Sequence, residues 1–127
     1  MGYGLLAEVC TILTIIAITV LHRYVFAKGL SAADYAAFGE RTGMIVGIVG
    51  GTIYTLLFAR LLTRSLADRQ VAHGVVVAVA AIALSMGGSL AGHHGLPSGY
   101  LLASILKLGA GAVAGFIAAR SRAPLPA

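Results

Sequence analysis

The sequence predicts an all-α integral membrane protein, a bundle of four transmembrane helices that form one domain over residues 1–127. Hydrophobic residues make up 59% of the chain and charged residues only 10%, whereas a soluble domain carries about 25% charged residues. The mean hydropathy is +0.96. Because a spanning helix needs roughly 20 apolar residues, four spans with short connections nearly fill the chain. These observations exclude a soluble fold.

Basic residues outnumber acidic ones, nine to four, which gives a formal charge of +5. In a soluble protein this balance would point to nucleic acid. Here the basic residues gather at the ends of the apolar runs, where they act as anchors and topology signals. We therefore expect the lipid bilayer, and not nucleic acid, as a partner.

The first two spans are predicted at residues 3–26 and 42–62. In the first span, only threonines interrupt the apolar run 9–21. Between the spans, Ser31 and Asp34 have the spacing of a helix N-cap followed by an acid in the first turn. We therefore expect a helix to begin there, outside the hydrocarbon, and to continue into the second span.

The third and fourth spans are predicted at residues 71–92 and 100–119. A polar turn precedes the third span, and a loop rich in glycine and proline, 93–99, follows it. With four spans, both termini lie on the side of the polar turn, which collects five arginines against three basic residues opposite. The positive-inside rule then predicts that both termini are cytoplasmic, in a bacterial inner membrane. The five are Arg60, Arg64, Arg69, Arg120 and Arg122, and the three are Arg23, Lys28 and Arg41.

Small residues recur at helical spacing in the last three spans. In lipid, such glycine ridges let neighbouring helices approach backbone to backbone. We therefore expect the bundle to pack through them, and Gly47→Leu to disturb packing more than leucine at a neighbouring valine. The predicted packing residues are Gly43, Gly47, Gly51, Ser85, Gly88, Ser89, Gly92, Gly111 and Gly115.

Two ionisable residues, Glu8 and Lys107, are candidates for proton or ion coupling. The stretch from Glu8 to Arg23 measures about 22 Å as a helix, less than a hydrocarbon core of about 30 Å, so Glu8 is expected near or below the headgroups. The alternative is that the helix slides until Glu8 reaches the interface. Lys107 is expected to snorkel outward or to enter a polar pocket. A direct pair is expected to be poor, because helical side chains lean toward their own N-terminus and would diverge in this topology.

The segment Leu6-Ala7-Glu8-Val9, in the first span of a four-span chain of this size, resembles the start of the small multidrug-resistance transporters. In that family a membrane glutamate binds protons and cationic drugs, so the resemblance implies this role for Glu8. The chain departs from the family in having no tryptophan and in carrying Lys107 in its last span. We therefore do not assign it to that family.

Three histidines, His22, His93 and His94, are expected on one side of the membrane and are weak candidates for haem or metal ligands. Two of them are adjacent in a glycine-rich loop, which is a poor arrangement for matched ligands. We therefore predict no cofactor. The sequence has no serine–histidine–acid grouping, phosphate loop or acid cluster, so an enzyme is not expected either.

Two classes of function follow from these patterns. Short loops, few intramembrane charges and many small-residue faces favour a non-catalytic subunit that stabilises itself, as a homo-oligomer, or a larger membrane complex. Glu8, Lys107 and the threonines of the first span favour a small ion- or proton-coupled transporter or channel instead.

Overall fold

The computed structural model describes residues 2–91 and 99–121, and every regular element in these ranges is helical. The first helix, α1 (Gly2–Leu21), ends in a π-helical segment, η1 (His22–Phe26). The second is continuous through α2 (Ala32–Ile45), the π-helical segment η2 (Val46–Gly50) and α3 (Gly51–Thr63). The last two are α4 (Gln70–Ala91) and α5 (Tyr100–Arg120).

Four of these helices are long and apolar enough to cross a membrane, as predicted: Gly2–Phe26, Ala32–Thr63, Gln70–Ala91 and Tyr100–Arg120. The second extends ten residues before the predicted start of its span, because its N-cap lies at Ser31. There the Ser31 Oγ accepts a hydrogen bond from the Asp34 N–H at 3.2 Å. The N-cap expected from the sequence is therefore confirmed. The four apolar helices indicate a membrane protein.

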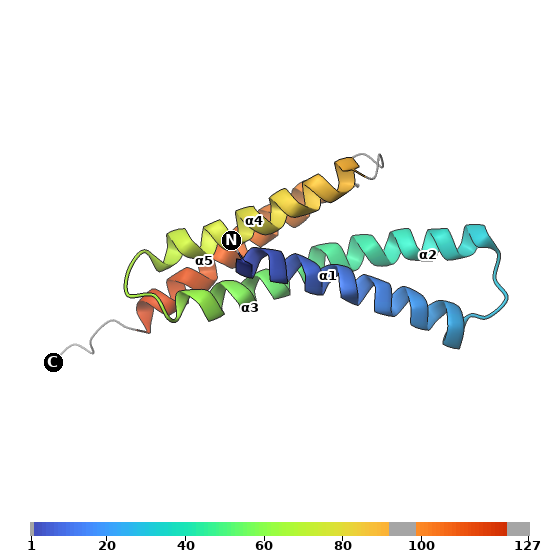
Figure 1. Cartoon of the computed structure of the whole chain (residues 1–127), viewed down its shortest axis with the longest axis horizontal. Coiled ribbons are helices and arrows are strands. Elements are labelled where there is room, and N and C mark those ends of the chain that lie inside the picture. The colour runs from blue at the N-terminus through green and yellow to red at the C-terminus, as the bar shows by residue number, and fades with distance from the viewer. Residues whose placement is uncertain (1, 92–98, 122–127) are drawn as a thin grey trace.

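Figure 1 shows two antiparallel pairs, α1 with α2 and α4 with α5, which diverge toward one end of the molecule. At the opposite end, α3, which continues α2 through η2, lies beside α4 and α5. The N-terminus lies near the middle of the molecule's length, whereas the C-terminal end of α5 lies at one extremity (Figure 1). The helix α1 is therefore shifted along the bundle axis relative to α4 and α5.

Burial in this fold is inverted relative to a soluble protein. Among the described residues, the buried apolar side chains are alanines and a single valine, Val77. The large aliphatic and aromatic side chains are mostly exposed, as at Phe26, Leu101 and Ile105. Small residues inside and large apolar residues outside are the expected arrangement when lipid, and not water, surrounds the helices.

The closest backbone approach joins α4 to α5. A Cβ atom added at Gly74 would collide with the Gly111 carbonyl oxygen, and one added at Gly115 would collide with the backbone of Gln70 and Val71. Gly111 and Gly115 thus lie at a close approach of two helices, and their contribution to the stability of the bundle stays a prediction. Their partner Gly74 was not predicted, although Ala78 lies four positions after it and gives the third span a second small-residue pair.

Candidate functional site

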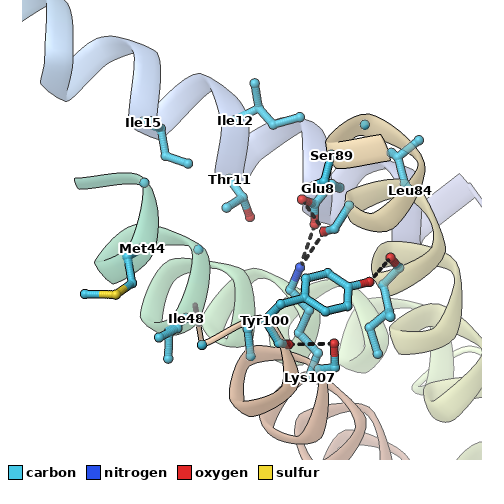
Figure 2. A pocket seen from close by; sticks show the side chains of 18 residues that line it. Glu8, Thr11, Ile12, Ile15, Met44, Ile48, Leu84, Ser89, Tyr100 and Lys107 are labelled. Carbon is cyan, nitrogen blue, oxygen red and sulfur yellow. Dashed lines mark hydrogen bonds and ion pairs between the residues drawn. The ribbon is translucent and has the colours of Figure 1, made fainter. Parts of the chain in front are cut away.

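Three helices each contribute one polar side chain to a buried cluster, which we call the Glu8 cluster: Glu8 from α1, Ser85 from α4 and Lys107 from α5. The Lys107 Nζ donates to Glu8 Oε2 at 2.8 Å and to Ser85 Oγ at 3.0 Å. The Ser85 hydroxyl donates to the other carboxylate oxygen of Glu8 at 2.6 Å. Glu8 is 7% exposed and Lys107 is 4% exposed. Figure 2 shows these bonds converging beside a pocket.

The prediction that Glu8 and Lys107 diverge was wrong, and the shift of α1 explains why. A Cβ at Gly4 would meet the backbone of Val77 and Ala81, well inside α4. Measured along α4 from its first residue, Gln70, the start of α1 therefore lies about 10 Å toward the C-terminal end of α4. With this shift, Glu8 reaches the depth of Lys107, about 20 Å from the end of α5. Lys107 accordingly turns inward and does not snorkel.

Gly51, at the start of α3, leaves the space that the Lys107 side chain occupies. A Cβ at this position would lie 2.8 Å from Lys107 Cε and 3.4 Å from Nζ. Gly51 was predicted to pack against another helix, but its close neighbour is a side chain, and its role is to admit the lysine. The glycine therefore allows the ammonium to reach Glu8 across the bundle.

A pocket of about 440 Å³ lies next to the Glu8 cluster, where the two helix pairs begin to diverge. Its size is within the range of small-molecule sites. Most of its wall is apolar, with Ile12, Ile15, Met44, Ile48 and Leu84 placed around the space (Figure 2). Hydroxyl groups of Thr11, Ser89, Tyr100 and Ser104 also line it.

Several of the predicted packing residues line this pocket instead of packing against a helix. Gly43, Gly47 and Gly88 all line it, and a Cβ at any of them would meet nothing within 4 Å. Among residues 2–91 and 99–121, no other helix makes the backbone approach expected at these three glycines. Ser85 and Ser89 also line the pocket, whereas Gly92 lies outside the described residues.

The wall formed by Gly47 and Ile48 belongs to η2, the π-helical segment inside the second long helix. π-helical turns inside α-helices often occur at functional sites, because they change which side chains face a given direction. Here the segment coincides with the glycine-rich run that the sequence analysis singled out. The run therefore shapes the pocket wall, a role that its composition alone did not indicate.

Neither His22 nor His73, the two histidines within the described residues, lines this pocket. His22 stacks on Phe38, with ring centroids 3.5 Å apart, and its edge faces Tyr35. His93 and His94 lie outside the described residues. Within residues 2–91 and 99–121, no group of three or more metal-ligating side chains is present.

Thr11, Tyr100 and Ser104 line the pocket but were not predicted as site residues. A signal for them exists, because Tyr100, Ser104 and Lys107 follow each other at four and three residues and thus share one helix face. Glu8 and Thr11 share a face of α1 by the same spacing. Polar stripes facing each other across an apolar bundle would have indicated the site.

The resemblance of residues 6–9 to the small multidrug-resistance transporters covers one turn of α1 and does not include Ser85 or Lys107. The function is therefore argued from the geometry of the Glu8 cluster and its pocket. Among known protein families, curated proteins and solved structures, we find no match to this chain.

Proposed function

We propose that the protein is a small proton-coupled membrane transporter, with the pocket as its substrate site and the Glu8–Lys107 pair as its coupling element. One observation carries the proposal: a buried ion pair, 2.8 Å long, lines a pocket between candidate membrane spans. Ionisable residues inside spans typically mark substrate or proton pathways.

A purely structural role explains this pair less well. Replacing a buried ion pair by apolar residues is often neutral or stabilising, and apolar residues would also insert into lipid more readily. The helices already meet through small residues such as Gly74 and Gly111. A bundle of this kind therefore gains little stability from a pair of opposite charges at its centre.

The cluster links α1 to α5 directly and to α4 through Ser85. A proton that reaches the Glu8 carboxylate removes its charge, so the attraction that holds α1 to Lys107 weakens. The helix pairs α1 with α2 and α4 with α5, which both contribute residues to the pocket wall, then separate more easily. In this mechanism protonation biases an equilibrium between a closed and an open pocket.

The test uses purified protein in liposomes that contain a pH-sensitive dye, to which alkyl alcohols, amines and sulfonates are added one at a time. At least one class of compound should drive proton movement, and Glu8→Gln should abolish it. Glu40→Gln is the matched control, because Glu40 is an exposed acid on α2. If no compound moves protons through the unaltered protein, the transporter proposal fails.

We further propose the orientation in which both termini face the cytoplasm of a bacterial inner membrane. The arginines at the ends of α3 and α5, together with those of the turn before α4, lie at one end of the molecule. The connection between α1 and α2 lies at the other end (Figure 1). The excess of arginine at the first end supports a cytoplasmic placement.

A second candidate is the subunit function, in which the protein assembles with itself or with a larger membrane complex. It is favoured by Gly39, Gly87 and Gly109, where an added Cβ would meet nothing within 4 Å and which do not line the pocket. Such positions permit close approach by a helix of another chain. Purification from native membranes in mild detergent, with larger proteins in fixed ratio, would favour this function over transport.

A further inference from the structure

We infer that the pocket binds a neutral amphipathic molecule, with an apolar body and a polar end that carries O–H or N–H donors. The inference rests on the proposed function only in taking the pocket as the substrate site. Three observations support it: the wall is mostly apolar, most of the hydroxyl hydrogens in it are already used in hydrogen bonds within the chain, and the charges of the Glu8 cluster cancel.

The apolar wall determines the body of the ligand. Ile12, Ile15, Met44 and Ile48 surround the space on the side of α1 and α2, and Leu84 lies on the side of α4 (Figure 2). Figure 2 shows Glu8, Tyr100 and Lys107 together on the side of the pocket away from Ile15 and Met44. A ligand that matches this division has one apolar and one polar end.

The hydroxyl groups determine which polar end fits. The Thr11 hydroxyl donates to the Ala7 carbonyl at 2.9 Å, and the Tyr100 hydroxyl donates to the Ile82 carbonyl at 2.9 Å. The Ser104 hydroxyl donates to the Tyr100 carbonyl at 2.8 Å. Each of these hydrogens is therefore used within the chain, and the lone pairs of the oxygens remain as acceptors.

The Glu8 cluster adds to this excess of acceptors. Each carboxylate oxygen of Glu8 accepts one hydrogen bond within the described part of the chain, Oε1 from Ser85 and Oε2 from Lys107, and each can accept a second. On the donor side, Lys107 keeps one N–H, and the Ser89 hydroxyl makes no hydrogen bond within the described part of the chain. Acceptors thus outnumber donors, so a ligand with donor groups satisfies more of the pocket.

The charge balance argues against an ionic head group. Glu8 and Lys107 neutralise each other, so a cation or an anion would have to displace one partner. The displaced partner would remain buried without a counter-ion, which is strongly unfavourable. A neutral donor group can bind the free lone pairs and leave the ion pair intact.

The test is equilibrium binding of radiolabelled 1-decanol to the purified full-length protein in mild detergent. Decyl methyl ether, decyltrimethylammonium and decanesulfonate serve as competitors that lack the donor or carry a charge. We expect saturable binding of the alcohol and at least tenfold weaker competition by each of the other three. Equal competition by the ether, or stronger competition by either ion, would overturn the inference.

Two leucine variants show whether the binding occurs in this pocket. Gly47→Leu should abolish saturable binding because its side chain enters the pocket, and it should remain folded because a Cβ there meets nothing within 4 Å. Gly87→Leu is the matched control, with equally open surroundings outside the pocket. Binding that survives in Gly47→Leu, or absence of saturable binding in the unaltered protein, refutes the inference. Saturable binding without proton movement in liposomes would refute the transport proposal alone.

Discussion

Replacing Glu8 and Lys107 separately and together measures what the buried ion pair contributes to stability. Glu8→Met leaves the ammonium of Lys107 with Ser85 as its only hydrogen-bond partner among the described residues, and Lys107→Met likewise leaves the carboxylate of Glu8 with Ser85 alone. Methionine suits both positions because it is unbranched, flexible and apolar. The two single variants therefore each create one buried, uncompensated charge.

The expected magnitudes follow from burial. The side chains of Lys107 and Glu8 are only 5% and 9% exposed, so water compensates little of the lost partner. Each single variant should lose about 3–5 kcal/mol of unfolding free energy. The double variant contains no buried charge, so it should be about as stable as the unaltered protein, or more stable by about 1–4 kcal/mol.

The measurement is equilibrium unfolding in mixed micelles, with helix content followed by circular dichroism. Glu40→Met is a control for the loss of an acid, because Glu40 is exposed and should change stability little. Losses that simply add in the double variant would refute the reasoning, since residues in contact are expected to be strongly non-additive. Additive losses would mean that the two charges act independently.

Three further predictions concern topology, packing and capping. In a background without Cys10, cysteines at Lys28 and Ala67 should be labelled by an impermeant reagent from opposite sides of the membrane, and labelling from the same side would contradict four spans. Gly74→Ala should lower the thermal unfolding temperature markedly, because the added methyl group would collide with the backbone of α5. Gly87→Ala should not, because a Cβ there meets nothing within 4 Å. Equal effects of the two variants would argue against close packing at Gly74. Ser31→Ala should lower stability by about 1 kcal/mol through loss of the N-cap, and an unchanged unfolding free energy would show that the cap contributes nothing.

The number and type of helices could be predicted from the sequence because they depend on local properties. Apolar runs of sufficient length give spans, and the pair Ser31 and Asp34 gives a helix start. Both signals are contained within one segment of chain, so no knowledge of the other segments is needed. Glu8 and Lys107 were likewise identified as unusual by their charge within apolar runs.

The contact between Glu8 and Lys107 could not be predicted in the same way, because it depends on the relative shift of helices. The expected divergence follows only if the helix ends are level, because the depth of each residue is then its distance from the end of its own helix. The contact of Gly4 with Val77 and Ala81 shows that they are not level. A shift of about two turns, or roughly 10 Å, changes which residues meet across the bundle.

The divergence of the two helix pairs decides which small residues pack and which face the pocket. Gly111 and Gly115 lie where α5 runs directly against α4, so their missing side chains allow backbone contact. Gly47 and Gly88 lie where the two helix pairs diverge, so the same missing side chains enlarge a space. A glycine ridge in a membrane bundle therefore does not by itself predict whether a helix packs against it or a pocket opens beside it. Its role depends on whether another helix is present at that depth, and in this chain the depth at which the helices diverge is also the depth of the buried ion pair.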